Sequence, residues 1–246
     1  MAASGRTRLD QALVARGYFS SRARARDAVE RGCVVVDGQV ARKPGQLISS
    51  DDPVSVDDPA SRYVARSALK LSAALDAFGV DPAGRHALDV GQSTGGFTQV
   101  LLERGAAHVT GVDVGHGQVH PSLQDHQQIT ILEGINARHA DQMPVGPFDL
   151  AVIDVSFISL RLILPVVASR LKRGGPAVAL FKPQFEVGRS SVGSGGIVTQ
   201  PDAVDEALDG LERAVPQLGL RWHASIRSPL PGADGNVERL VHLVRL

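Results

Sequence analysis

Short apolar runs that alternate with helix-like stretches, from residue 85 to the C-terminus, are the feature that most restricts how this chain can fold. Such alternation is typical of a mostly parallel β-sheet covered by helices on both faces. The last two runs flank a turn-rich segment at residues 229–236, which indicates a final pair of strands. We therefore predict an α/β fold with seven strands, at residues 86–90, 108–112, 129–133, 149–154, 177–182, 221–228 and 238–246.

Composition excludes several classes of protein. The chain has 246 residues, 43% of them hydrophobic, which is enough for one large domain or for a large domain with a small one attached. No apolar run approaches the ~20 residues that span a bilayer, and residues 1–10 contain no apolar signal segment. The single cysteine, Cys33, cannot form an internal disulfide. We expect a cytoplasmic protein that does not act at a membrane.

Basic residues are concentrated at the start of the chain. The formal net charge is zero, but residues 1–50 carry nine basic and four acidic side chains. A small basic segment attached to a mildly acidic body favours contact with a polyanion. The alternative is an arginine-rich helix face that is merely solvated.

Residues 1–60 predict two helices followed by a small sheet. An apolar stripe from Leu9 ends at Gly17, and Ser21 can cap a second helix that ends at Gly32. An Asp-Gly pair interrupts the β run at residues 34–40, which is a strong hairpin signal. Three motifs stand at the starts and turns of these elements: Arg8-Leu9-Asp10, Ser21-Arg22 and Val36-Asp37-Gly38. With these motifs, the order of elements resembles the S4 RNA-binding domain.

The segment that joins the two parts is rich in Ser, Asp and Pro. After it, a helix is predicted at residues 64–78, with an apolar face that includes Leu71 and Leu75. We expect an S4-like domain at residues 1–60, a linker and entering helix at residues 61–84, and a larger domain at residues 85–246.

A glycine-rich segment, residues 89–98, follows the first strand of the larger domain. Its glycines and the helix start after them allow a ligand to approach the backbone and its free N–H groups. The spacing matches neither the dinucleotide pattern nor a P-loop. Asp113 ends the second strand, where a carboxylate can accept hydrogen bonds from a ribose. These features predict a nucleoside cofactor, and the alternative is an ordinary turn before a capped helix.

Polar residues also follow the next three strands. Ligands of open α/β sheets bind outside the carboxyl ends of the strands, where Asn136, Asp154 and Lys182 fall. Asn136 either contacts a base or bonds its own loop. Asp154 follows four apolar residues and needs a partner, whereas Lys182 on its own is equally compatible with a surface position. Lys70 on the entering helix and Glu238 at the last strand are expected to converge with them on one pocket.

Four segments, residues 89–98, 153–159, 182–186 and 235–238, extend a resemblance over nearly the whole chain. They resemble the TlyA family of S4-containing, FtsJ-like ribosomal RNA 2′-O-methyltransferases, which are often labelled haemolysins. The resemblance implies a Rossmann-like sheet, S-adenosylmethionine (SAM) as cofactor, and a cytidine in 16S rRNA, in 23S rRNA or in both as target. It also implies a catalytic tetrad of Lys70, Asp154, Lys182 and Glu238.

Strand-end positions and this resemblance together define candidate binding residues. The cofactor set is Asp89, Gly91, Ser93, Thr94, Gly95, Gly96, Phe97, Asp113, Asn136 and Asp154. The RNA set is Arg8, Arg22, Arg24, Arg26, Arg31, Lys43 and Arg66. The expected partner is ribosomal RNA or a ribosomal subunit, and the protein is expected to be a monomer or a weak dimer. The histidines show no metal-ligand pattern.

Some stretches leave alternatives open. Residues 65–68 lack the glycines that the family carries before its first lysine, and residues 119–124 contain no Lys or Arg. The Gly- and Ser-rich residues 186–196 either close over a substrate or only connect two elements. Two other functions are a non-catalytic RNA-binding assembly factor and a membrane-active haemolysin. The latter would need an amphipathic or spanning segment, which the sequence does not show.

Overall fold

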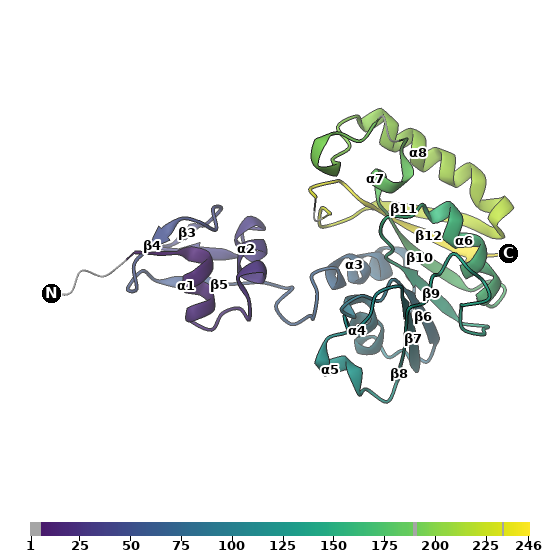
Figure 1. The fold of residues 1–246 in the computed structure, drawn as a ribbon, viewed down its shortest axis with the longest axis horizontal. Coiled ribbons are helices and arrows are strands. Elements are labelled where there is room, and N and C mark those ends of the chain that lie inside the picture. The colour runs from purple at the N-terminus through teal and green to yellow at the C-terminus, as the bar shows by residue number, and fades with distance from the viewer. Residues whose placement is uncertain (1–5, 189–190, 233) are drawn as a thin grey trace. The chain divides into compact units, whose positions relative to one another are not determined.

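The computed structural model describes residues 6–188, 191–232 and 234–246. The chain divides into two compact units, Met1–Arg62 (unit 1) and Tyr63–Leu246 (unit 2), which are drawn from purple to yellow along the chain (Figure 1). Unit 2 contains all of the seven-stranded sheet and also the helix that enters it.

Unit 1 contains two helices and two small antiparallel sheets. Its core includes Leu9, Leu13 and Val29 from the helices and Val34 from the sheet. As predicted, Ser21 caps the second helix by accepting a hydrogen bond from the Arg24 main chain. The short strands β1 and β4 were not predicted. The elements are β1 (Thr7–Arg8), α1 (Leu9–Ala15), α2 (Arg22–Glu30), β2 (Val34–Val36), β3 (Gln39–Val40), β4 (Leu47–Ile48) and β5 (Val54–Val56).

Unit 2 is built on a seven-stranded mixed sheet with strand order β11-β12-β10-β9-β6-β7-β8. Five neighbouring strands run parallel, and β12 and β11 are added antiparallel at one side, which confirms the predicted α/β fold with a final strand pair. The strands are β6 (His86–Val90), β7 (His108–Asp113), β8 (Ile129–Glu133), β9 (Leu150–Ile153), β10 (Pro176–Phe181), β11 (Leu220–Arg227) and β12 (Arg239–Arg245).

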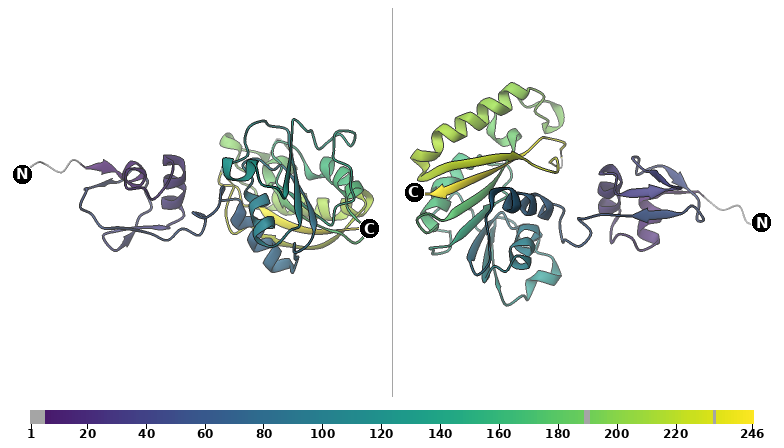
Figure 2. Two further views of the ribbon diagram at one scale, coloured as in Figure 1. Left: turned by 90° about the horizontal axis from the view of Figure 1, so that it is seen from below. Right: turned by 180° about the vertical axis from the view of Figure 1, so that it is seen from behind.

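Helices cover both faces of this sheet (Figure 2). Alternate residues of one strand pack in different cores: Leu150 and Val152 lie with α3 and α4, whereas Ala151 and Ile153 lie with α6 and α8. This period of two follows from the pleat of a β-strand whose two faces are both buried. The helices are α3 (Ala68–Phe78), α4 (Gly96–Glu103), α5 (Pro121–Gln124), α6 (Leu160–Arg170), α7 (Pro183–Glu186), η2 (Ser194–Gly196), α8 (Pro201–Ala214) and η3 (Val215–Leu218).

The entering helix α3 begins at Ala68, four residues later than predicted. The main-chain N–H of Val64 donates to the Gln99 side chain instead of to a helical turn, and Tyr63 is buried in the core beside α3 and α4. The segment before α3 is therefore anchored by contacts with α4, which helical periodicity does not reveal.

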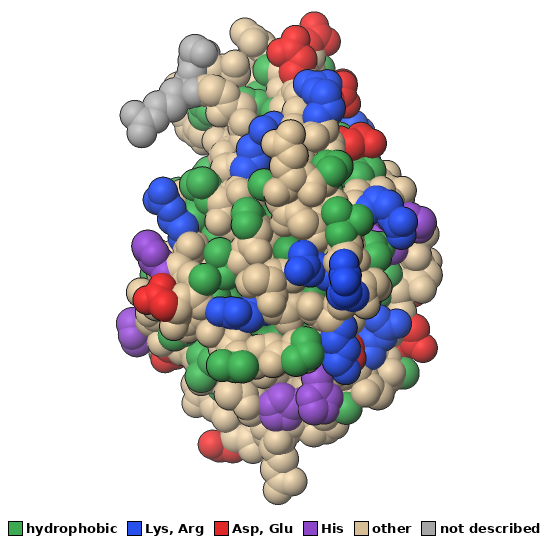
Figure 3. All heavy atoms as spheres, turned by 90° about the vertical axis from the view of Figure 1, so that its right-hand side faces the viewer, with side chains coloured by type: hydrophobic (Ala, Val, Ile, Leu, Met, Phe, Trp, Pro, Cys, Tyr) green, Lys and Arg blue, Asp and Glu red, His purple; other side chains and the backbone are tan. Residues whose placement is uncertain are grey.

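One face of unit 2 lies at the amino ends of the parallel strands. Lys172 and Arg173 are exposed just before β10, and Arg245 ends β12. Lys and Arg side chains gather across the middle of the surface that carries the C-terminus, and acidic side chains lie nearer its rim (Figure 3). Lys172 forms an ion pair of 2.5 Å with Asp149 on this side of the sheet.

Arg31 forms a buried ion-pair network that joins α2 to the end of unit 1. Its two terminal nitrogens each donate to an oxygen of Asp58 at 2.8 Å, and its Nε donates to Asp27 at 2.8 Å. Only 13% of the Arg31 side chain is exposed. Burial is the largest influence on the pKa of Asp58 and raises it, but the hydrogen bonds from Arg31 and from the Ala60 main chain, together with the positive charges nearby, lower the pKa overall.

Arg31→Ala is therefore expected to destabilise unit 1 by about 3 kcal/mol, because it leaves the carboxylate of Asp58 buried without its partner. Arg26→Ala, on the exposed side of the same helix, is the matched control and should change stability by less than about 0.5 kcal/mol. Hydrogen exchange of unit 1 amides in both variants measures the difference. Equal protection in the two variants would contradict a structural role for Arg31.

Candidate active site

Two adjoining cavities lie at the carboxyl ends of the parallel strands. Their volumes are about 270 and 400 Å³. Both are lined by Gly91 and Ser93 after β6 and by Asp154 and Ser156 after β9. Loops at this edge meet because neighbouring parallel strands end there together. A ligand in one cavity therefore lies directly beside a ligand in the other.

The larger cavity combines an apolar wall with two polar side chains. Ile135, Ile158 and Ile163 contribute to the wall, and Asp113 and Asn136 contribute the polar groups. The two oxygens of Asp113 accept main-chain hydrogen bonds of 2.8 Å, one from Ser93 and one from Gly115. A carboxylate oxygen can accept more than one hydrogen bond, so Asp113 retains capacity for a ligand's hydroxyl groups.

Asn136 makes the local loop bond that was one of the two roles left open by the sequence, and it also reaches a cavity. Its side-chain oxygen accepts a hydrogen bond of 3.1 Å from the Arg138 main chain, which is a local turn bond. The residue also lines the larger cavity. The local bond fixes the side chain, and its amide nitrogen can still face a ligand.

The glycine-rich segment after β6 packs against the segment after β9. Gly91 has a φ of 85°, and a Cβ at this position would overlap the main-chain carbonyl of Asp154. Gly95 has a φ of 94°, and a side chain there would meet Leu123 of α5. Glycine is required at both positions for conformation and for space. Thr94 and Phe97 line the smaller cavity, whereas Gly96 packs near Ser67.

Asp89 lies beneath this segment and does not line either cavity. Its side chain is fully buried, and it accepts a hydrogen bond of 2.6 Å from Thr98, which in turn accepts one from Gln92. Burial raises the pKa of Asp89 to about 7, although the Thr98 hydrogen bond opposes this shift. Asp89 thus supports the cofactor segment from below, and the structure does not bring it to the cavity surface.

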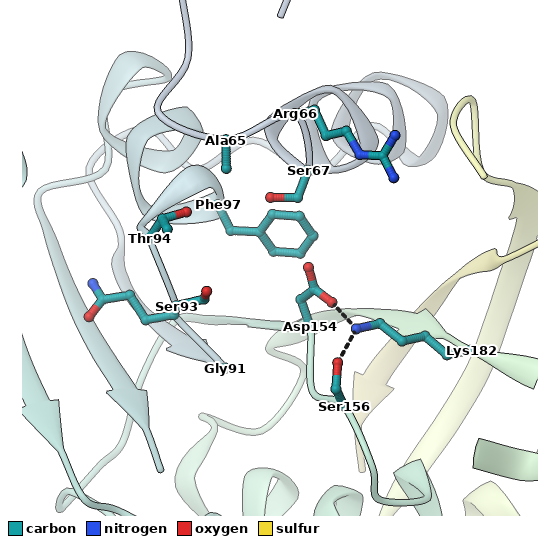
Figure 4. A pocket seen from close by; sticks show the side chains of 11 residues that line it. Ala65, Arg66, Ser67, Gly91, Ser93, Thr94, Phe97, Asp154, Ser156 and Lys182 are labelled. Atoms are coloured by element: carbon teal, nitrogen blue, oxygen red, sulfur yellow. Dashed lines mark hydrogen bonds and ion pairs between the residues drawn. The ribbon is translucent and has the colours of Figure 1, made fainter. Parts of the chain in front are cut away.

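Asp154, Lys182 and Ser156 converge in the smaller cavity (Figure 4). The ammonium of Lys182 lies 2.7 Å from Oδ1 of Asp154 and donates to Oγ of Ser156 at 2.8 Å. The side chains of Lys182 and Asp154 are 12% and 19% exposed, so the pair is shielded but can be reached by a ligand. Only the contact with Ser156 is a hydrogen bond, because Oδ1 of Asp154 has no hydrogen-bond partner among the described residues, so the ammonium keeps N–H groups for a ligand.

Lys70 and Glu238 form a second ion pair. Nζ of Lys70 lies 2.5 Å from Oε2 of Glu238, and 7% and 3% of the two side chains are exposed. The pair joins α3 to the residue just before β12, and neither residue lines the two cavities within the described part of the chain. The predicted tetrad is therefore arranged as two ion pairs, of which one faces a cavity.

Three residues beside these pairs had no role assigned from the sequence. Ser156 holds Lys182, as described above. Glu186 accepts hydrogen bonds from the Ser159 side chain and the Leu160 main chain, at 2.7 and 2.6 Å, and thereby caps α6. Burial raises the pKa of this carboxyl. A carboxylate four residues after Lys182 was visible in the sequence, but nothing indicated that it would cross to another loop.

Phe157 is the third of these residues. Its side chain is 91% exposed at the edge of the larger cavity, and its φ is 65°, which is rare for a residue with a side chain. Its ring lies 5.2 Å from the ring of Phe185. An exposed aromatic ring in a strained backbone conformation beside a cavity is available for stacking on a flat ligand.

The predicted RNA-binding residues fall into different environments. Arg22, Arg26 and Lys43 are exposed on unit 1, as is Arg8, whereas Arg31 is largely buried in its ion pairs. The remaining two have other contacts. Arg24 donates to the main-chain oxygens of Ala60 and Ser61, and Arg66 lines the smaller cavity of unit 2.

Asn236 fixes the far end of the loop whose role the sequence left open. Its side-chain oxygen accepts a hydrogen bond from the Val198 main chain, and its amide nitrogen donates to the Gly196 carbonyl, both at 2.9 Å. Residues 189 and 190 of this loop lie outside the described residues. Across the described ranges, no cluster of His, Cys, Asp and Glu is suited to a metal ion, and no helix is long and apolar enough to span a bilayer.

Comparisons with known proteins agree with this arrangement. A model of FtsJ-like methyltransferases matches residues 63–245, and a model of the S4 domain matches residues 7–54. The 16S/23S rRNA (cytidine-2′-O)-methyltransferase TlyA of Mycobacterium tuberculosis is 43% identical over 97% of this chain and 90% of its own length. Hemolysin A of Brachyspira hyodysenteriae is 34% identical over 96% of this chain and 99% of its own length.

A solved structure extends the similarity to three dimensions. A protein from Streptococcus thermophilus that is described as a hemolysin shares 37% sequence identity and has a TM-score of 0.76, covering 99% of this chain and 90% of its own. Relatives named as methyltransferases and relatives named as hemolysins therefore share one architecture with this chain. The chain belongs to the FtsJ-like methyltransferases and, with its S4 domain and its similarity along nearly the whole length, to their TlyA family.

Proposed function

We propose that this protein methylates the 2′-hydroxyl of a cytidine ribose in ribosomal RNA, with S-adenosylmethionine as the methyl donor. The observation that carries the proposal is the ammonium of Lys182, fixed between Asp154 and Ser156 where two cavities adjoin. The curated TlyA relative from M. tuberculosis supports the choice of reaction and of cytidine, because its name states both.

The larger cavity fits the adenosine part of the proposed cofactor. Asp113 offers carboxylate oxygens to the two ribose hydroxyls, and Asn136 offers an amide to the base. The isoleucines in the wall provide an apolar surface for a flat ring. When bound, SAM would supply an electrophilic methyl group to a nucleophilic oxygen. The other residues of the site have to place and deprotonate that oxygen.

Lys182 and Asp154 would position the target ribose. Ser156 accepts a hydrogen bond from Lys182 and Asp154 holds the ammonium by charge, so a remaining N–H can donate to the 2′-oxygen and hold it in one place. Proximity and orientation of this kind account for a large part of many enzymatic rate enhancements. The hydroxyl proton can leave through the adjacent carboxylate of Asp154 to water. The exposed ring of Phe157 is available to stack on the target base.

Unit 1 would supply affinity for the RNA. Arg22 and Arg26 on α2 and Lys43 in the turn before β4 are exposed and can neutralise backbone phosphates. Such contacts give affinity and register more than sequence readout. Sequence selection then rests with unit 2 and with the fold of the RNA. The methyltransferase site and the S4 domain thus have complementary tasks in one reaction.

The first test is methyl transfer from labelled SAM to isolated 30S and 50S subunits. Lys182→Ala should lower the single-turnover rate by at least ~100-fold, because the 2′-hydroxyl loses its positioning group. Lys172→Ala is the matched control, since Lys172 also pairs with an aspartate but at the opposite end of the sheet. Near-normal transfer by Lys182→Ala would contradict the proposed role. Absence of label with wild-type protein that binds subunits would favour an assembly factor without catalysis.

A second test addresses the cofactor alone. Asp113→Ala should weaken SAM binding about 10-fold, because charged hydrogen bonds to the ribose are lost. Gly91→Ala should weaken it as well, since a side chain there displaces the Asp154 segment. Calorimetric titration with SAM measures both, and Asp81→Ala, an exposed residue in the turn before β6, is the control. Unchanged binding in Asp113→Ala would exclude the proposed ribose contact.

A third test uses the pKa of Asp89. Because burial raises this pKa from 3.8 to about 7, the folded protein holds one more proton than the unfolded chain between these two values, so stability is highest in acid and falls until the pH reaches about 7. Thermal unfolding of the wild type should therefore shift to lower temperature as the pH rises from about 4 to about 7, relative to Asp89→Asn, in which this position cannot ionise. Fluorescence of Trp222, which lies in unit 2, reports the transition. Parallel pH profiles of the two proteins would contradict the shifted pKa.

A further inference from the structure

Asp10 is a fully buried carboxylate that two exposed arginines share. Its side chain is 0% exposed, and each of its two oxygens accepts two hydrogen bonds. Oδ1 accepts from Nε of Arg8 at 3.1 Å and from the Gln11 main chain at 3.0 Å. Oδ2 accepts from Nη2 of Arg8 at 3.2 Å and from Nη2 of Arg22 at 3.0 Å. The carboxylate is thus fully used within unit 1.

The two arginines come from separate elements and meet only at this carboxylate. Arg8 ends β1 and Arg22 begins α2, and their side chains remain 44% and 55% exposed. Asp10 engages one edge of the Arg8 guanidinium and one nitrogen of Arg22. Within residues 6–188, 191–232 and 234–246, Nη1 of Arg8 and the other nitrogens of Arg22 have no partner. The remaining N–H groups can therefore bind an acceptor from outside the protein.

The turn that contains Lys43 and Gly45 lies against Arg8 and Asp10. The Asp10 main chain donates to the Pro44 carbonyl at 2.9 Å, which fixes this turn beside the carboxylate. Gly45 lies so close to Arg8 that a Cβ there would be 2.9 Å from Nη1. Lys43 is exposed at the start of the turn. Lys43 thus begins a turn that packs against Arg8 and Asp10.

Two adjacent guanidinium groups repel each other unless an anion lies between them. Two hydrogen bonds from Arg8 and one from Arg22 hold the pKa of Asp10 at about 2 against the opposing effect of burial. Asp10 is therefore ionised throughout the neutral range and keeps the arginines together before any ligand arrives. Each guanidinium loses side-chain freedom in the free protein, so less is lost when a ligand binds.

We propose that Asp10 is a positioning residue that holds Arg8 and Arg22 as a preassembled binding site for a backbone phosphate of RNA. This inference rests on the proposed function, because it takes ribosomal RNA as the ligand of unit 1. Phosphate is the acceptor that suits two forked guanidinium groups, since its oxygens accept several charged hydrogen bonds at once. Lys43 adds a further positive charge on the turn that packs against Arg8.

The proposed role of Asp10 predicts an effect on RNA binding that is opposite in sign to the effect expected from net charge alone. Removing an acidic group from an RNA-binding surface adds one positive charge and should strengthen binding if only the field of the surface matters. If Asp10 positions the arginines, Asp10→Asn should weaken binding in spite of the added charge. Asp37→Asn is the matched control, because Asp37 is exposed at a turn of the same unit and asparagine tolerates its φ of 49°.

The experiment measures binding of the full-length protein to deproteinised 16S and 23S rRNA at several salt concentrations. Asp10→Asn should raise the Kd at least ~5-fold and lower the salt dependence, as phosphate contacts are lost. Asp37→Asn should bind as the wild type or more tightly. In methylation assays the loss should fall on KM for rRNA and not on kcat. Equal or tighter binding by Asp10→Asn would overturn the inference.

Gly45→Ala perturbs the same site without changing charge. The added Cβ displaces the guanidinium of Arg8, while the backbone of Gly45 is not in the left-handed region and accepts alanine. This variant should keep the unfolding temperature of unit 1 and raise the Kd for rRNA about 2- to 5-fold. It decides the question if Asp10→Asn fails to fold, and wild-type affinity in Gly45→Ala would then overturn the inference.

The same assays separate this inference from the proposed function. A wild-type protein that methylates rRNA, together with unchanged binding by both variants, would leave the function intact and remove the role of Asp10. A wild-type protein that binds rRNA with the predicted loss in both variants, but transfers no methyl group, would support the phosphate site and contradict the proposed catalysis. Failure of the wild type to bind either rRNA would overturn both.

Discussion

Burial of both faces of the unit 2 sheet is the constraint on which the rest of the site depends. Leu150 and Val152 face one layer of helices and Ala151 and Ile153 face the other, so β9 has no side for polar groups until it ends. The first polar side chain after it, Asp154, therefore stands at the carboxyl edge. The same holds for Lys182 after β10, and the polar side chains of the candidate site therefore lie together at this edge of the sheet.

Much of this arrangement could be predicted from the sequence, because it follows from local patterns. The seven apolar runs became the seven strands, with boundaries that differ by a residue or two, since apolar period and turn residues are read locally. The helix start at residue 68 was misplaced, because the anchoring bond from Val64 to Gln99 spans 35 residues. The two-residue strands β1 and β4 are too short to leave a periodic signal.

The sequence, through its family resemblance, indicated candidate site residues but not how they would pair or which of them would face a cavity. Residues Lys70, Asp154, Lys182 and Glu238 were identified in their order, but the sequence could not show which carboxylate faces which lysine. That choice depends on how α3 and the turn before β12 pack, which is a tertiary property. The roles of Ser156 and Glu186 could not be predicted for the same reason, because each residue acts by a hydrogen bond to a partner on another loop.

Arginine in unit 1 illustrates how little net charge says about individual residues. Arg31 is a buried brace with Asp27 and Asp58, and Arg16 donates to the main-chain oxygens of Ser49, Ser50 and Asp52 and so closes a loop. Both residues count toward the basic charge of the N-terminal segment, yet the side chains of both donate hydrogen bonds to groups within unit 1. The basicity that a polyanion meets is therefore smaller, and more sharply located, than the composition indicates.

The two cavities of unit 2 have four lining residues in common, and no wall of independent structure separates them. Gly91 lies against the carbonyl of Asp154, so the segments after β6 and β9 must move together if either moves. A single elongated inhibitor could therefore extend through both spaces, with a purine-like group among the isoleucines and a hydroxylated end at Lys182. Because its two ends are linked, binding of one end would raise the effective concentration of the other at the second cavity, so the compound would bind more tightly than two separate ligands.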